Sequence, residues 1–143
     1  MGPGESRKLA DWPIADLLGG QAEPHEVCAL VHLRGDGCTG ENFSALVPWK
    51  WVTLPHPKIE SSLRQNEDRL ELVVESPQVI PFFHAELEGR EGHFQGDWRI
   101  LRPGSRYVLP WVPHVHRGAA KPSLKEARGL LKSFSLWDTY EHE

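Results

Sequence analysis

The sequence lacks the features that mark several large classes of protein. No apolar run approaches the roughly 20 residues of a membrane-spanning helix, and the N-terminus, MGPGESRKLADW, has no basic-then-apolar signal-peptide pattern. A net charge of -4 leaves no basic footprint for nucleic acid or for an anionic membrane. We therefore expect neither nucleic acid nor a membrane as a partner, and a cytoplasmic protein if the chain is encoded alone.

Cysteine is nearly absent, since Cys28 and Cys38 are the only two. Cys28 falls in an apolar alternation and Cys38 in a glycine-rich turn. A bridge between them stays open, but one buried thiol and one exposed thiol is the simpler expectation. Apolar surroundings raise the pKa of a thiol, so Cys28 is expected to be unreactive.

Complete motifs for nucleophilic or metal-dependent chemistry are also missing. There is no Gly-x-Ser-x-Gly elbow to present a nucleophilic serine. His114 and His116 can lie on one face, but no residue at matching spacing completes the three or four ligands of a zinc site. We expect no metal and no cofactor.

The residues that are present indicate a single small domain of strands and turns. A chain of 143 residues can bury a core, but an eight-fold β/α barrel needs about 250 residues. Six tryptophans and twelve prolines suit a strand-and-turn protein in which aromatic rings supply much of the buried area.

Apolar alternation and turn residues predict about seven strands, a pattern typical of an all-β, antiparallel β-sandwich. The expected strands are 26–33, 43–54 (interrupted by Pro48), 58–65, 70–75, 81–87, 106–112 and 133–140. A short helix is expected over 14–18, ended by two glycines. The capping box Ser123-x-x-Glu126 predicts a second helix of about two turns. Residues 1–24 form an irregular segment or linker, and residues 25–143 form the sandwich.

The apolar faces of these strands also predict the core. The residues expected to lie in one sandwich core are Val31, Leu72, Val74, Phe83, Leu109 and Leu136.

Five short motifs occur in a fixed order along the chain. They are Asn42-Phe43-x(4)-Pro48-x-Lys50, Leu54-Pro55-x-Pro57-Lys58-Ile59, Gly92-His93-Phe94, Leu101-x-Pro103-Gly104 and Leu136-Trp137-Asp138-Thr139-Tyr140. This order, over roughly residues 25 to 140, resembles the C-terminal end of β-mannosidases of glycoside hydrolase family 2. That family has Gly-Arg-Phe-Ser-Asp-Asn-Gly-Phe. In this chain Phe94 is followed by Gln95-Gly96-Asp97 and then by Trp98, so the segment between the two aromatic residues is one residue shorter.

The resemblance implies both a fold and a role. In that family the segment is a terminal Ig-like β-sandwich, and the catalytic site lies upstream in a barrel. It implies a non-catalytic accessory domain that packs against the barrel and the preceding Ig-like domain. The parent enzyme would hydrolyse terminal β-D-mannose residues with retention of configuration.

The carboxylates of the chain do not form a catalytic pair. A retaining glycosidase needs two carboxyl groups about 5 to 5.5 Å apart on rigid elements. The only Asn-Glu sequence, Asn66-Glu67, lies in a polar turn, and Glu86 and Glu88 lie on a strand face that we expect to meet solvent. We therefore expect no enzymatic activity from this chain alone.

The aromatic residues are the one constellation that indicates binding. Trp49, Trp51, Phe94 and Trp98 are candidates for contact with a sugar or with a neighbouring domain. Trp49 and Trp51 are two residues apart, which on a strand places both on one face. A carbohydrate-binding sandwich that contacts an oligosaccharide is the alternative function. A coplanar exposed pair favours sugar binding, and a mixed apolar patch favours domain docking.

Overall fold

The computed structural model describes residues 8, 10–35, 37–114 and 121–140. These residues form nine strands in antiparallel pairs, two short α-helices and two 3-10 helices, so the expected all-β fold is confirmed. Contacts divide the chain into two compact units, Met1–Leu54 and Pro55–Glu143. The division thus falls after Leu54, whereas the sequence pattern groups residues 25–54 with the sandwich.

The first unit consists of a helical turn, a hairpin and a 3-10 helix. The helix α1 (Ile14–Leu18) ends, as predicted, at Gly19, whose φ of 55° is the left-handed conformation that favours glycine. The strands β1 (Cys28–Gly35) and β2 (Cys38–Ala45) pair antiparallel. The expected strand 43–54 is wrong beyond Ala45, because the chain passes Pro48 into the 3-10 helix η1 (Trp49–Trp51).

The hairpin register separates the two cysteines. Cys28 pairs with Ala45 at one end of the hairpin, and Cys38 pairs with Gly35 at the other. Seven residues of strand separate Cys28 from Gly35, which is roughly 23 Å at the usual rise of a strand. A disulfide needs Cα atoms closer than about 7 Å, so the backbone excludes a bridge. Partial burial raises the pKa of the Cys28 thiol.

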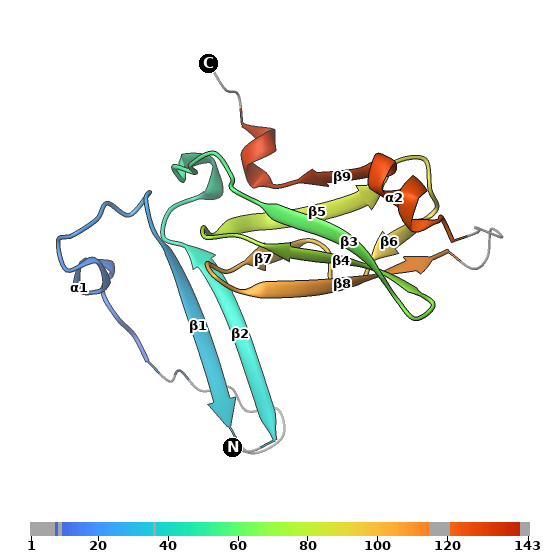
Figure 1. The fold of residues 1–143 in the computed structure, drawn as a ribbon. Coiled ribbons are helices and arrows are strands. Elements are labelled where there is room, and N and C mark those ends of the chain that lie inside the picture. The colour runs from blue at the N-terminus through green and yellow to red at the C-terminus, as the bar shows by residue number, and fades with distance from the viewer. Residues whose placement is uncertain (1–7, 9, 36, 115–120, 141–143) are drawn as a thin grey trace. The chain divides into compact units, whose positions relative to one another are not determined.

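The second unit is an antiparallel β-sandwich (Figure 1). One sheet has the strand order β3-β4-β8-β6 and the other has the order β7-β5-β9. The strands are β3 (Glu60–Asn66), β4 (Arg69–Glu75), β5 (Ile80–Leu87), β6 (Gly92–Phe94), β7 (Arg99–Leu101), β8 (Arg106–Pro113) and β9 (Leu131–Phe134).

The core of the second unit is apolar and continuous. Phe83, Leu72, Val74 and Leu109 have no exposed surface and lie in one cluster, as predicted. The cluster also contains Leu63, Leu70, Ile80, Ala85, Leu87, Phe94, Leu101, Trp111 and Ala127.

Two of the predicted core residues lie elsewhere. Val31 is 53% exposed on the hairpin of the first unit, whose described strands form a single two-stranded sheet. Leu136 is half-buried outside the core cluster, because the chain leaves the sheet after Phe134 and forms the 3-10 helix η3 (Leu136–Thr139).

Hydrogen bonds at two serines explain the C-terminal segment. The helix α2 (Leu124–Leu130) begins, as predicted, at Ser123, whose hydroxyl oxygen accepts a hydrogen bond from the Glu126 amide at 3.3 Å. The Glu126 carboxylate forms an ion pair with Arg90. The expected strand 133–140 is wrong beyond Phe134, because Ser135 and Asp138 form a capping box that starts η3.

Candidate functional site

The turn between β6 and β7 holds a hydrogen-bonded polar cluster on the surface of the sandwich. Phe94 anchors the turn in the core, and the Gln95 amide donates to the Pro110 carbonyl at 2.7 Å. The Asp97 amide donates to the Phe94 carbonyl at 3.3 Å. Gly96 and Trp98 both have positive φ, 79° and 58°. The chain therefore reverses tightly and presents Asp97 and Trp98 to β5.

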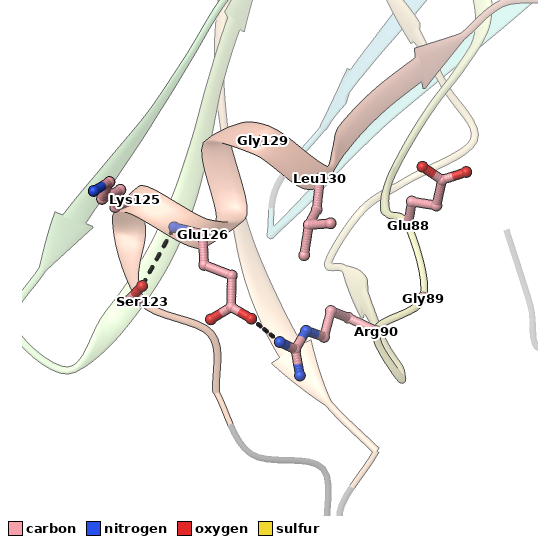
Figure 2. A pocket seen from close by; sticks show the side chains of 8 residues that line it. All are labelled: Glu88, Gly89, Arg90, Ser123, Lys125, Glu126, Gly129 and Leu130. Atoms are coloured by element: carbon pink, nitrogen blue, oxygen red, sulfur yellow. Dashed lines mark hydrogen bonds and ion pairs between the residues drawn. The ribbon is translucent and has the colours of Figure 1, made fainter.

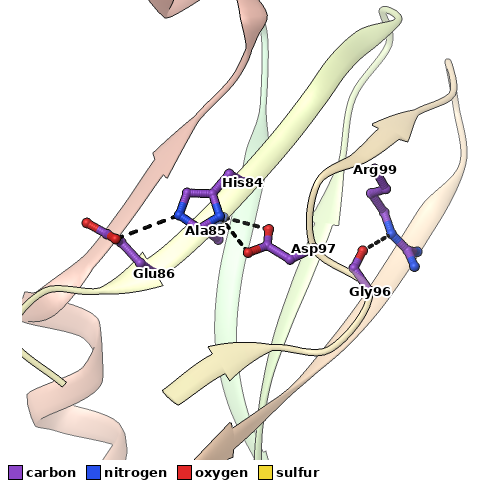
Figure 3. Close-up of polar contacts among 6 residues, drawn as sticks. All are labelled: His84, Ala85, Glu86, Gly96, Asp97 and Arg99. Carbon is purple, nitrogen blue, oxygen red and sulfur yellow. Dashed lines mark hydrogen bonds and ion pairs between the residues drawn. The ribbon is translucent and has the colours of Figure 1, made fainter. Parts of the chain in front are cut away.

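Asp97 joins this turn to the middle of β5 (Figure 3). Its Oδ2 lies 2.5 Å from Nδ1 of His84, and its Oδ1 accepts the Ala85 amide at 3.0 Å. Both oxygens are therefore engaged, and the carboxylate is only 9% exposed. A carboxylate accepts hydrogen bonds, so His84 must donate from Nδ1. In the neutral imidazole, Nε2 is then an acceptor.

Aromatic rings form a row on the outer face of the β7-β5-β9 sheet. Phe83 and Ala85 face the core, so His84, which lies between them, points outward. The imidazole stacks on Trp98 with centroids 4.5 Å apart and planes 14° apart. It also stacks on Phe134, its cross-strand partner in β9, at 6.1 Å. Trp98, at 66% exposure, is the outermost ring of the row.

Glu86 completes the cluster. It lies two residues beyond His84 on the same face of β5. One carboxylate oxygen is 3.7 Å from His84 Nε2, and about half of the side chain is exposed. The His84 ring that stacks on the exposed indole therefore has a carboxylate beside each of its nitrogens, Asp97 at Nδ1 and Glu86 at Nε2.

The four aromatic residues selected from the sequence are divided between the two units and differ in exposure. Phe94 is fully buried, so its assignment as a contact residue is wrong. Trp49 is half-buried and stacks on Phe43 with centroids 5.8 Å apart. Trp51 is exposed, with the Lys50 ammonium 5.0 Å from its ring centroid. Trp49 and Trp51 lie on a 3-10 helix rather than on one strand face, so the argument for a strand-based platform fails.

The sequence pattern missed the polar residues that support Trp98. His84 and Glu86 alternate with the buried Phe83, Ala85 and Leu87, so the strand period already placed them outward. Asp97 was visible only as part of a turn. No local signal connects Asp97 with His84, because the contact joins a turn to a strand 13 residues earlier in the chain.

Three further acidic residues of the described part of the chain, Glu67, Glu71 and Glu88, serve structural roles or lie in solvent. Glu71 is buried, and its carboxylate accepts hydrogen bonds from Arg64 at 2.8 Å and from Asn66 at 3.1 Å. The Asn66 hydrogen bond and then that from Arg64 lower the pKa of Glu71. Glu67 lies exposed in the turn after β3, as expected, and Glu88 bonds to Lys132.

An open cleft beside α2 contains charged groups that pair with one another. It is lined by Glu88, Gly89, Arg90, Ser123, Lys125, Glu126, Gly129 and Leu130 (Figure 2). Arg90 pairs with Glu126 across it, and the Ser123 hydroxyl caps α2. These groups stabilise the junction between α2 and the chain after β5, and they do not converge on a point where a ligand would sit.

The histidines give no metal centre in the part of the chain that is described. No group of three or more His, Cys, Asp or Glu side chains there has the geometry to hold a metal ion. The His114 ring lies 5.6 Å from that of His93, whereas His116 falls outside the described residues.

No protein-family model matches this chain, and no curated protein matches it. None of the helices in the described residues is long and apolar enough to cross a membrane. The residues and their geometry therefore carry the functional assignment.

Proposed function

We propose that this chain is a non-catalytic C-terminal accessory domain of a β-mannosidase-like glycoside hydrolase. In this role it packs against the catalytic barrel and the preceding Ig-like domain of an enzyme that removes terminal β-D-mannose. The order of motifs that resembles the family supports the proposal, and so does the all-β fold of the residues that carry them.

The backbone at Trp98 strengthens the resemblance. In the family segment, glycine is the fourth residue after phenylalanine, and here Trp98 is the fourth residue after Phe94. Its φ of 58° is a conformation that favours glycine and is rare for a bulky residue. When Trp98 takes the place of that glycine, the two segments have equal length and no residue is missing.

The observation that carries the proposal is the uncovered apolar surface of the first unit. Among the described residues, Val52 is its only buried hydrophobic side chain. Its exposed large hydrophobic residues are Trp12, Ile14, Leu17, Leu30, Val31, Leu33 and Trp51. An apolar cleft also lies open between α1 and β1, lined in part by Trp12, Leu17, Val27 and Leu30. Exposed patches of this kind mark surfaces that bind another protein or domain.

The carboxylates are consistent with a role outside the chemistry. Among the described residues, the two most buried acidic side chains are Glu71 and Asp97, and both accept hydrogen bonds from neighbouring structural groups. A glycosidase would need one carboxyl group to be available as a proton donor and a second to be available as a nucleophile.

The proposal is tested by fusing this chain to a family 2 β-mannosidase whose own C-terminal domain has been removed. We expect the fusion to regain soluble expression and turnover of an aryl β-mannoside, and we expect the chain alone to give only the buffer rate. The control fusion carries Val31→Asp and Leu33→Asp, which place charge on the docking surface. Equal recovery in both fusions, or turnover by the isolated chain, would contradict the proposal.

A further inference from the structure

We propose that the first unit dimerises through β1, whose outer edge pairs with the same edge of a second copy of this chain. The outer edge is the side of β1 that faces away from β2. The two hairpins then form one four-stranded antiparallel sheet, with Leu30 on the two-fold axis. The proposal does not rest on the accessory-domain role, because it depends only on the first unit and its copy.

The outer edge of β1 lacks the usual protection of an edge strand. Among the described strands β1 pairs only with β2, and no loop of the described part forms a backbone hydrogen bond with it. Edge strands are commonly protected by short length or by charged side chains. Here β6 and β7 have three residues each, β9 has four and contains Lys132, and β3 contains Glu60 and Arg64. By contrast, β1 has eight residues, no proline and one permanent charge, that of Arg34 near its end.

The hairpin register shows which backbone groups reach the outer edge. A two-residue turn joins Gly35 to Cys38, and the pair that flanks such a turn is hydrogen-bonded. Hydrogen-bonded and non-hydrogen-bonded pairs alternate along an antiparallel ladder. Cys28, Leu30 and His32 therefore direct their N–H and C=O groups away from β2, and they offer donors and acceptors to a new strand.

A two-fold axis at Leu30 matches these backbone groups with themselves. Leu30 then lies opposite the partner's Leu30, and Cys28 lies opposite the partner's His32. Each of these pairs joins two residues whose N–H and C=O groups point to the shared edge, so each can form the two hydrogen bonds of a narrow antiparallel pair. The contact is isologous and closes at the dimer.

The apolar side chains match in the same register. Val27 lies opposite the partner's Leu33, and Ala29 lies opposite the partner's Val31. Residues directly opposite in an antiparallel pair share one face of the sheet and stabilise it through side-chain contact. Val31 and Leu33, which are 53% and 51% exposed in the single chain, thus gain apolar neighbours.

Charge complementarity selects this register among those with the same backbone pattern. Glu26 immediately precedes the extended segment and Arg34 lies near its end, and both side chains are exposed. With Leu30 on the axis, each Arg34 lies opposite the partner's Glu26, so the dimer contains two ion pairs. An axis at His32 would instead place Arg34 opposite the partner's Leu30. Complementary charges fix the register of an interface in this way.

An open cleft of about 490 Å³ gives the second strand room beside α1. Residues 27–31 line one wall, and Leu17 and Leu18 of α1 lie on the other with Trp12 (Figure 1). Successive side chains of a strand point to opposite faces of the sheet, so a wall of five successive residues is an edge rather than a face. None of the described residues that line the cleft is charged, which suits the apolar side chains of the partner's β1.

A strand from another protein is the competing occupant, because any extended segment can add to a sheet edge. Self-pairing is favoured because β1 complements itself in backbone direction, in apolar side chains and in charge. A foreign strand would satisfy the backbone groups but would have no need of the match between Glu26 and Arg34.

The first test is a disulfide across the two-fold axis. In a chain with Cys28→Ser and Cys38→Ser, Leu30→Cys should give a covalent dimer under mild oxidation. Opposite residues of a hydrogen-bonded pair have Cα atoms about 5.5 Å apart, which a disulfide can span. Asn42→Cys in the same background is the control, because Asn42 is exposed but lies on β2, and it should give little covalent dimer.

The second test reverses the charges and measures dimerisation by sedimentation. The average mass of the parent chain should level off at that of a dimer. Arg34→Glu and Glu26→Lys should each raise the dissociation constant roughly tenfold, because two ion pairs become two like-charge contacts. The chain with both changes restores opposite charges and should dimerise nearly as well as the parent. This rescue separates a broken contact from a misfolded variant.

The proposal is overturned if the parent stays monomeric, or if Leu30→Cys cross-links no better than Asn42→Cys. It is also overturned if the doubly reversed chain dimerises no better than the single variants, since the register would then be wrong. A dimer that forms as expected, together with a fusion that fails to regain turnover, would contradict the proposed function alone.

Discussion

At the residue scale, burial separates side chains that the sequence pattern treats alike. Val31 and Val74 both occupy apolar positions of alternating strands, yet Val31 is 53% exposed and Val74 is fully buried. Alternation identifies the apolar face of a strand, but it does not say whether another layer covers that face. The contribution of each side chain to the stability of the fold therefore depends on whether another layer buries it.

Phe83→Ala is the sharpest test of the core. The ring is fully buried in the main cluster, so its removal should lower the free energy of unfolding by about 3 to 5 kcal/mol. The exposed Val31→Ala should change it by no more than about 0.5 kcal/mol. Urea denaturation measures both variants, and similar midpoints for the two would show that the core assignment is wrong.

Glu71 should contribute to the acid sensitivity of the fold. Hydrogen bonds from Asn66 and Arg64 lower its pKa in the folded state, so the unfolded state binds the proton more readily. The stabilisation is therefore present above the unfolded pKa of about 4.3 and is lost as the pH falls through the lower folded value. Glu71→Gln should cost stability at pH 7 and progressively less below pH of about 4.

Denaturation of both proteins between pH 7 and pH 3 measures this difference. The exposed Glu67→Gln serves as the control and should show no such convergence with the parent. A constant gap between parent and Glu71→Gln across the whole range would contradict the prediction.

At the element scale, capping decides where the regular structure begins and ends. Ser123 starts α2, and Ser135 with Asp138 starts η3. The sequence Ser123-x-x-Glu126 before an apolar segment predicts the first of these helix starts. The second lies inside a run that resembles a strand, and its hydrogen bonds turn the chain out of the sheet. Local side chains therefore outweighed strand propensity at the C-terminal end.

Ser123→Ala should destabilise the second unit by about 0.5 to 2 kcal/mol, the usual cost of losing an N-cap. The effect should reach the whole unit, because Leu124 and Leu130 pack against the core cluster. Ser62→Ala, at an exposed position of β3, is the matched control and should be nearly neutral. Thermal unfolding compares the two, and equal melting temperatures would show that α2 does not depend on this cap.

At the scale of the whole molecule, the two units differ in how they bury apolar surface. The second unit contains the core cluster. Of the exposed large hydrophobic residues described, only Trp98, Val108 and Phe134 belong to the second unit, and the others belong to the first. The first unit has Val52 as its one buried hydrophobic residue among those described. A two-stranded hairpin is at best marginally stable alone in water, so we expect the stability of this unit to depend on contacts beyond its own residues.

We expect the isolated chain to self-associate through the first unit. Sedimentation at increasing concentration should show a rising average mass. The double variant Val31→Asp, Leu33→Asp should remain closer to the monomer, because charge on the hairpin opposes apolar association. Val108→Asp changes an exposed apolar residue of the second unit and should leave the association intact. A parent chain that stays monomeric at every concentration would contradict the expectation.

The sequence by itself determined the local structure wherever one short-range rule dominated. Strand alternation predicted β4, β5 and β8, and paired glycines ended α1. These features depend on neighbours within a few residues, which the sequence displays directly. The same patterns predicted the all-β class and the core positions Leu72, Val74, Phe83 and Leu109.

The tertiary structure alone decided which faces are covered and which side chains meet. It placed Phe94 inside the core and left Val31 exposed. It also joined Asp97 to His84 and stacked His84 on Trp98. These contacts link residues more than ten positions apart on separate elements, and the free energy that selects them comes from packing the whole unit. No local pattern contains that information, so the candidate site became visible only in the folded molecule.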